Sequence, residues 1–123
     1  MEDRATRKFQ KEMNAGAISL VVLAVIDQLG RPVYGYEVAG MLAQGAGDRL
    51  PMNQAAIYPV LRSLEKQSLL ASELEASDAG PPRRYYQLTN SGRQALTNWK
   101  AAWQKTSRFV NSVLEGFDDH RIA

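Results

Sequence analysis

The stretch that decides the fold is 53-NQAAIYPVLRSLEKQ-67. With successive residues about 100° apart around a helix, one arc of this stretch is apolar. That arc carries Ala56, Ile57, Val60, Leu61 and Leu64, and the opposite arc carries Ala55, Tyr58, Pro59, Arg62 and Lys66. The pattern predicts a helix that is buried on one side and offers a small, aromatic and basic strip on the other.

Tyr58-Pro59 limits where this helix can begin. Proline is tolerated in the first helical turn, where amide hydrogens have no partner within the helix. We therefore expect the helix to begin near Ala55, or to have a kinked first turn. Either arrangement would leave amides at a helix N-terminus free to meet a phosphate.

Two or three helices are expected before this stretch. Residues 2–14 have helical composition, and Asn14 or Gly16 is expected to break or bend the chain before a buried helix over 16–29. That apolar run follows basic residues, as in a signal peptide, but it ends at Asp27 and is too short for a bilayer. The next helix covers 36–44, with Val38, Met41 and Leu42 inward, before a glycine-rich loop.

A hairpin and a long helix are expected after it. Residues 69–76 alternate as a strand, with Leu70, Ser72 and Leu74 on one face. A Gly/Pro loop leads to a second strand over 83–89, in which Tyr86 faces the core and Tyr85 faces away. Thr89 is a suitable N-cap for a last helix that starts near Asn90.

That last helix has the clearest periodicity in the chain. Spacings of three and four connect Leu96, Trp99, Trp103, Thr106, Val110, Val113 and Phe117. This seam is longer than a small domain needs for its own core, so we expect it to contact another chain. Thr106 is its one polar member.

Composition narrows the function classes. The chain has 123 residues, a formal net charge of +2 and no cysteine, which excludes disulfides, thiolate zinc sites and cysteine nucleophiles. Its single histidine, His120, and the absence of a nucleotide-binding fingerprint argue against an enzyme, and no cofactor is expected. We expect a cytoplasmic, soluble protein.

The order of elements predicts a mainly α fold with a two-stranded β-hairpin, which is a winged helix-turn-helix with a long C-terminal helix. We assign residues 1–89, including the N-terminal helix 2–14, to a DNA-binding domain and 90–119 to a dimerisation helix. In this class the third helix enters the major groove of double-stranded DNA and the hairpin, the wing, lies beside the duplex. Arg83 and Arg84 would lie at the wing tip, held by two prolines.

Three segments in order, 34-YGYEVAGML-42, 57-IYPVLRSLEKQSLL-70 and 81-PPRRYYQLTNSGRQAL-96, resemble the PadR family of transcriptional regulators. The resemblance covers about residues 16–96. It implies a dimeric winged-helix DNA binder, usually a repressor, of the smaller subfamily with a single C-terminal helix. This sequence has Ala55-Ala56 where the family commonly has Gly-Thr, and Ser68 where it usually has glycine, so the turn at Ser68 is in question.

The expected DNA contacts lie at the start of the second helix, on the third helix and on the wing. They are Tyr34, Tyr36, Asn53, Gln54, Ala55, Tyr58, Arg62, Lys66, Arg83 and Arg84, with residues 53–55 as the base readers. Structural alternatives remain open: Tyr58 could pack against a neighbouring helix, Arg62 and Lys66 could be a solvated face, and the two wing arginines could only solubilise the hairpin.

Trp99 and Trp103, four residues apart on one helical face, are expected to stack along the seam. In similar small regulators, aromatic residues at the dimer interface line a pocket for planar hydrophobic compounds, and Phe9 and Met13 could close such a pocket from the partner subunit. The alternative is that both tryptophans simply fill a dimer core. The expected partners are thus an inverted-repeat DNA operator, a second copy, and a planar hydrophobic or phenolic effector.

Two other functions compete with this prediction. A winged helix used only for protein association would need an apolar outer strip, which the basic residues contradict. A basic amphipathic membrane binder over residues 2–26 is less suitable, because the apolar run is explained as core.

Overall fold

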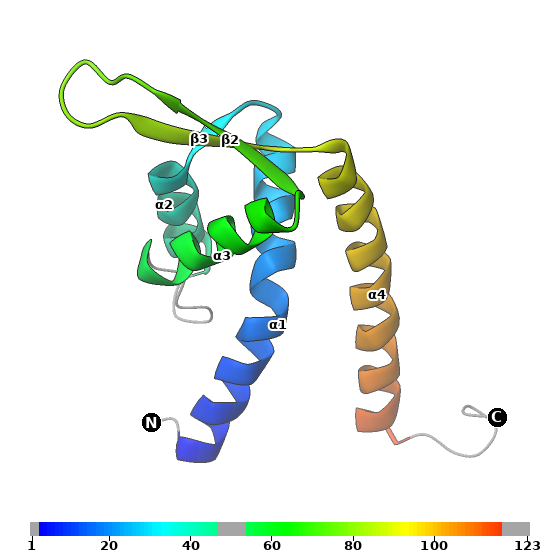
Figure 1. The fold of residues 1–123 in the computed structure, drawn as a ribbon. Helices are drawn as coiled ribbons and strands as arrows, with labels where there is room; N and C mark the ends of the chain where they lie inside the picture. Colours follow the sequence, from blue (N-terminus) through cyan, green and yellow to red (C-terminus); the bar gives the residue numbers. More distant parts are fainter. Residues whose placement is uncertain (1–2, 47–53, 117–123) are drawn as a thin grey trace.

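The computed structural model describes residues 3–46 and 54–116 (Figure 1). The elements are α1 (Arg4–Leu29), β1 (Val33–Tyr34), α2 (Gly35–Ala46), α3 (Gln54–Lys66), β2 (Leu70–Glu75), β3 (Arg83–Leu88) and α4 (Asn90–Leu114). The β2–β3 hairpin extends beyond α2, while the end of α1 and the start of α4 lie near the sheet and the two helices separate away from it. The predicted order of three helices, hairpin and long helix is confirmed.

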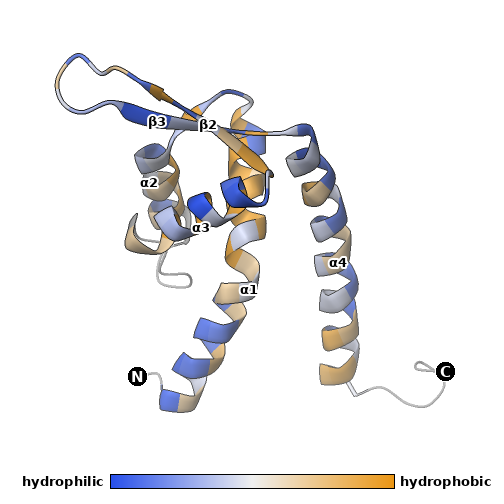
Figure 2. Ribbon diagram, viewed as in Figure 1, coloured by the Kyte–Doolittle hydropathy of each residue, from blue (hydrophilic) through white to orange (hydrophobic). Residues whose placement is uncertain are grey.

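The core lies where the C-terminal half of α1 meets α2, α3 and the sheet. Ile57, Leu61 and Leu64, on the predicted apolar arc of α3, have no exposed surface. They pack with residues from the other elements, namely Val22, Leu23, Ile26, Val33, Val38, Ala39, Leu42, Leu70, Tyr86 and Leu88. The inner faces of these elements are the hydrophobic ones in Figure 2. The inward placement of Met41 is wrong, because its side chain is exposed, and Leu74 is exposed at the outer end of β2.

α1 is one continuous helix, so the expected break at Asn14 or Gly16 is wrong. Asn14 accepts a hydrogen bond from Gln10 Nε2 at 2.7 Å, one turn earlier, and the space around Gly16 is open. One glycine inside a helix costs only about 1 kcal/mol, which neighbouring hydrogen-bonded turns overcome. Asp3 caps the start, accepting from the amide of Thr6 at 2.6 Å.

The continuous helix also changes the argument about membranes. By length and composition alone, the 26-residue α1 could cross a bilayer, so the expectation that this segment is too short does not hold. Its apolar end, however, supplies Val22, Leu23 and Ile26 to the protein core. A core helix of a soluble protein has the same composition.

The sheet has three antiparallel strands in the order β1-β3-β2, one more than the hairpin that the sequence predicts. β1 pairs Val33 with Tyr86 and Tyr34 with Tyr85. A two-residue strand is too short to show alternation in sequence. Tyr34 therefore belongs to the sheet, and α2 begins one residue later.

The end of α3 is tied to the start of α4. Ser68 has a left-handed φ of 63°, and the amides of Ser68 and Leu69 bond back to the carbonyls of Glu65 and Leu64, both at 2.9 Å. This is the Schellman ending, which glycine usually supplies. The Thr89 hydroxyl donates to the Ser68 carbonyl at 2.6 Å.

Thr89 is the N-cap of α4, as predicted, and accepts from the amide of Gly92 at 2.9 Å. Leu96 and Trp99 pack against the core. Further along, the seam residues Trp103, Val110 and Val113 are 40–48% exposed. The helix ends at Leu114, and Phe117, the last predicted seam residue, lies outside the described residues.

Candidate nucleic-acid interface

The outer strip of α3 is exposed as the sequence predicts. Ala55, Pro59, Arg62 and Lys66 are all open to solvent, on the side away from Ile57 and Leu61. The helix begins at Gln54, one residue before the predicted start; the side chain of Gln54 is not described, and Asn53 lies outside the described residues. Ala55 is therefore the one predicted base reader whose exposure the structure describes.

Pro59 lies inside α3, in its second turn and not its first. It has no amide hydrogen to donate to the carbonyl of Ala55, so the missing bond falls early in the helix. The ring itself is on the exposed side, away from the core. The helix continues through it because Ile57, Leu61 and Leu64 anchor both turns.

Tyr58, the remaining member of the predicted outer strip, is partly buried and packs on the core. A Cβ placed on Gly35, the first residue of α2, would lie 3.1 Å from Tyr58 Cε1, so the ring lies directly against that helix start. Burial raises the pKa of Tyr58, and the nearby phenols of Tyr34 and Tyr36 raise it further. This geometry agrees with the packing alternative, and it joins α3 to the first turn of α2.

Tyr34 and Tyr85, on the sheet face that does not pack on the core, form a cluster with Tyr36 in the first turn of α2. The rings of Tyr34 and Tyr36 stack with centroids 6.0 Å apart, and Tyr34 lies 5.9 Å from Tyr85. We call these three residues the tyrosine cluster. Arg83 places its Cζ 4.9 Å from the centre of the Tyr34 ring, within cation–π range. The sequence could not reveal this cluster, because it depends on the unpredicted pairing of β1 with β3.

Arg83 and Arg84 do not lie at the tip of the wing, contrary to the prediction. The register pairs Glu75 with Arg83 and Leu74 with Arg84, so the connecting loop 76–82 extends beyond both arginines (Figure 1). Because successive residues of a strand face opposite sides, the two side chains diverge. Arg84 Nη1 donates to Ser72 Oγ at 2.8 Å, on the face opposite Arg83.

An ion pair that the sequence does not reveal holds the first turn of α2, next to the tyrosine cluster. Arg31 Nη2 lies 2.5 Å from Glu37 Oε2, between the end of α1 and the first turn of α2. The hydrogen bond from Arg31 lowers the pKa of Glu37. A spacing of six residues across a turn carries no recognisable signal in sequence.

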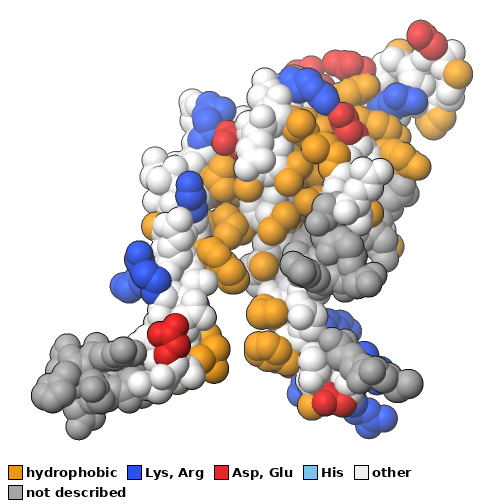
Figure 3. All heavy atoms as spheres, turned by 180° about the vertical axis from the view of Figure 1, so that it is seen from behind, with side chains coloured by type: hydrophobic (Ala, Val, Ile, Leu, Met, Phe, Trp, Pro, Cys, Tyr) orange, Lys and Arg blue, Asp and Glu red, His pale blue; other side chains and the backbone are white. Residues whose placement is uncertain are grey.

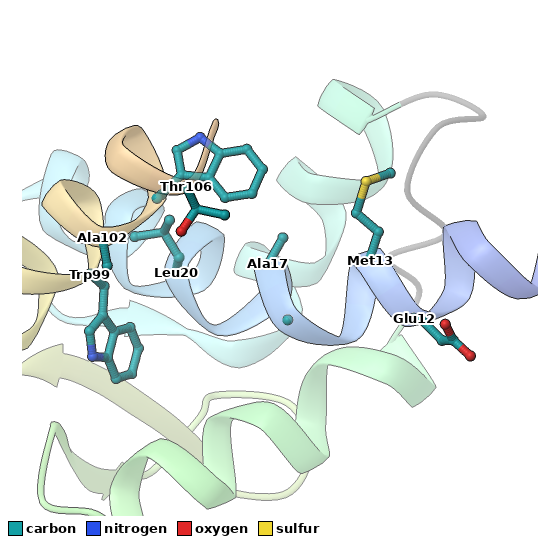
Figure 4. A pocket seen from close by; sticks show the side chains of 9 residues that line it. Glu12, Met13, Ala17, Leu20, Trp99, Ala102 and Thr106 are labelled. Carbon is teal, nitrogen blue, oxygen red and sulfur yellow. The ribbon is translucent and has the colours of Figure 1, made fainter. Parts of the chain in front are cut away.

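A groove of about 400 Å³ runs between α1 and α4. Its lining residues are Glu12, Met13, Gly16, Ala17, Leu20, Trp99, Ala102, Trp103 and Thr106. From behind, hydrophobic side chains follow the gap between the two helices (Figure 3). In the close-up, Met13, Ala17 and Leu20 come from α1, and Trp99, Ala102 and Thr106 from α4 (Figure 4).

The groove forms within one chain, so it does not require Met13 of a partner subunit as the sequence suggested. Met13 lines it together with both tryptophans of the same chain, while Phe9 is 62% exposed and lies outside the lining. Across residues 3–46 and 54–116, no group of three or more His, Cys, Asp or Glu side chains is placed to hold a metal ion.

The helix order, the hairpin wing and the exposed strip on α3 define a winged helix-turn-helix protein of the DNA-binding type. The chain belongs to the transcriptional regulator PadR-like family, whose model matches residues 22–98, more than half of the sequence. This family and fold are those of transcriptional regulators and not of enzymes.

Solved structures and a curated relative agree with this assignment. A PadR family transcriptional regulator from Eggerthella lenta is 32% identical, with 91% of this chain and 94% of that chain covered and a TM-score of 0.75. A PadR-like regulator from Bacillus cereus is 33% identical over 85% and 98% of the two chains, with a TM-score of 0.69. The transcriptional regulator Rv3488 of Mycobacterium tuberculosis is 39% identical over 59 residues, which span 48% of this chain and 54% of that relative.

Proposed function

We propose that this PadR-like regulator is a cytoplasmic homodimeric repressor that binds an inverted-repeat operator. Each α3 would enter a major groove, with Ala55 and its preceding residues at base edges and Arg62 and Lys66 at phosphates. Arg83 and the exposed phenol of Tyr36 would contact the adjacent backbone. Two-fold symmetry places the half-sites about one helical turn, or a multiple of it, apart.

One observation carries most of the argument. Tyr58 on α3 packs against Gly35, the first residue of α2, and Arg83 stacks on Tyr34. The outer strip of α3, the first turn of α2 and the base of the wing therefore adjoin one another, α3 through Tyr58 at Gly35 and the wing through Arg83 at Tyr34. A surface that combines exposed arginines, a lysine and tyrosine hydroxyls suits a phosphate backbone better than an apolar protein partner.

DNA binding by purified protein tests the proposal. Fluorescence anisotropy would compare a duplex from upstream of its own gene with a random duplex of equal length, at several salt concentrations. Arg62→Ala and Arg83→Ala should each weaken binding and reduce the salt slope by about one, as expected for a lost phosphate contact. Lys100→Ala, an exposed lysine on α4 away from the interface, is the matched control and should bind normally.

Failure to bind even random DNA at low salt would contradict the proposal. It would favour the alternative of a winged helix that associates only with protein. Equal loss in Lys100→Ala and Arg83→Ala would also count against a defined interface, since total charge would then explain the binding.

We also propose that the groove between α1 and α4 admits a planar hydrophobic or phenolic effector. Its volume is in the range of small-molecule sites, and its walls are mainly apolar and aromatic. Occupation would alter the angle between α4 and the DNA-binding domain, and through the dimer the separation of the two α3 helices.

Tryptophan fluorescence reports on this groove directly, because the only two tryptophans of the sequence both line it. Titration with planar drugs and phenolic acids should quench or shift the emission, and a ligand that does so should weaken operator binding. Ala17→Phe, which narrows the groove from α1 without adding a tryptophan, should reduce the response. No change with any member of the panel would contradict the effector proposal.

A further inference from the structure

The adjacent arginines at the start of β3 are held in different ways. Arg83 stacks on the Tyr34 ring, on the outer face of the sheet. Arg84 shares the opposite face with Tyr86, whose side chain is buried in the core. Its guanidinium therefore points toward α3 and not toward the tyrosine cluster.

A chain of two hydrogen bonds runs from Arg84 to α3. Arg84 Nη1 donates to Ser72 Oγ at 2.8 Å, and Ser72 Oγ donates to Glu65 Oε2 at 2.5 Å. The register explains the first contact, because Ser72 lies opposite Tyr86 and is thus the diagonal neighbour of Arg84. The second contact connects the sheet to the last turn of α3.

The ends of this chain are charged and its centre is a single hydroxyl. Ser72 uses its one proton toward Glu65 and its lone pairs toward Arg84, which defines the orientation of all three groups. The buried Tyr86 lies near both charged groups of this chain of hydrogen bonds. Burial raises the pKa of Tyr86, the Glu65 carboxylate raises it further, and the Arg84 guanidinium lowers it. The three side chains therefore bridge β3, β2 and α3 beside the core.

We infer that Arg84 is a positioning residue, which fixes the wing against α3 through Ser72 and Glu65 and does not itself bind DNA. This inference rests on the DNA-binding function proposed above. With the bridge in place, the spacing between Arg83 on the wing and Arg62 on α3 is set before DNA arrives. Without it, part of the binding free energy would be consumed in ordering the wing.

Ser72 allows a matched test that leaves every charge in place. Ser72→Thr keeps the hydroxyl, whereas Ser72→Val has nearly the same shape without it. The valine variant should bind the upstream duplex about tenfold more weakly than wild type, as expected for lost hydrogen bonds to charged groups. Its salt slope should be unchanged, and the threonine variant should bind within about twofold of wild type.

Arg84→Ala, made in the wild-type and in the Ser72→Val protein, separates positioning from direct contact. A positioning role predicts a large loss in the wild-type background and little further loss once Ser72 is valine. Equal losses in both backgrounds, with the salt slope reduced by about one as in Arg83→Ala, would overturn the inference. Circular dichroism melts would establish that each variant is folded at the assay temperature.

Hydrogen exchange without DNA separates this inference from the proposed function. Amides of the β2–β3 hairpin should exchange faster in Ser72→Val than in Ser72→Thr. If wild type binds no DNA but this difference appears, the bridge stands and the DNA-binding function fails. Identical exchange in both variants would overturn the bridge whatever the DNA result.

Discussion

Gly92 lies where the first turn of α4 crosses the chain that leaves α3. A Cβ at this position would be 2.0 Å from the carbonyl oxygen of Leu69, far inside van der Waals contact. That carbonyl also accepts the amide of Thr89 at 3.2 Å, so it cannot move away without losing a hydrogen bond. At this residue, the absence of a side chain is what lets α4 leave the sheet at its observed angle.

Gly92→Ala should therefore destabilise the protein by about 3 kcal/mol, the upper end of the usual cost of overpacking. Chemical denaturation followed by circular dichroism measures this. Gly16→Ala is the matched control: it lies in the middle of α1 with open space around it, and should stabilise by about 0.5–1 kcal/mol. Similar effects at both glycines would show that helix propensity, and not the contact with Leu69, dominates.

Ser68 is the reverse case to Gly92, because here a Cβ is present where the backbone conformation favours glycine. Its φ of 63° is a left-handed conformation that disfavours side chains, yet the Schellman ending of α3 requires it. Ser68→Gly should raise the free energy of unfolding by about 1 kcal/mol. Ser68→Ala should bring no such gain, because alanine keeps the Cβ that causes the strain. A glycine variant no more stable than alanine in thermal melts would contradict this account.

At the scale of elements, the start of α4 depends on one hydroxyl. Thr89 Oγ1 accepts from the Gly92 amide and donates to the Ser68 carbonyl, so it both caps α4 and holds the end of α3. β2 begins just after Ser68, and β3 ends just before Thr89. The same junction therefore fixes both the base of the wing and the start of α4.

Thr89→Ala should cost about 1–2 kcal/mol, the usual cost of losing a capping side chain. Thr89→Ser retains the hydroxyl and should lose less than half of that amount. Urea denaturation of both variants provides the comparison. Equal losses would mean that the threonine methyl, and not the cap, stabilises the junction.

At the scale of the whole molecule, α4 separates from α1 while its seam is still apolar. Trp103, Val110 and Val113 remain 40–48% exposed, and Phe109 and Leu114 are exposed beside them. A stripe of this kind is where the homodimer proposed above would pack a second copy along α4. The inverted-repeat operator proposed above depends on that pairing.

Val110→Asp should shift the protein from dimer to monomer at micromolar concentration, since it places a charge in the proposed interface. Asn111→Asp adds the same charge one residue later, on an exposed part of α4 off the seam, and should leave the dimer intact. Sedimentation equilibrium distinguishes the two outcomes. A wild-type monomer, or equal effects of both variants, would contradict dimerisation through this seam.

Elements whose residues repeat over a few neighbours can be predicted from the sequence alone. The apolar arc of α3, the alternation of Tyr86 and Leu88, and the Thr89 cap were readable because each depends on periodicity or on a few neighbours. The family resemblance rested on these same segments. The continuity of α1 was misread because glycine and asparagine weaken a helix only slightly, and packing at its other end decides the outcome.

Contacts between residues that are distant in sequence become visible only in the folded protein. The pairing of β1 with β3 created the tyrosine cluster, and the hairpin register moved Arg83 and Arg84 away from the wing tip and to opposite faces. The chain from Arg84 through Ser72 to Glu65 spans three elements that have no local relation in sequence. The physical reason is the same in each case: local patterns report which face of an element is buried, whereas register and packing determine which side chains meet across elements.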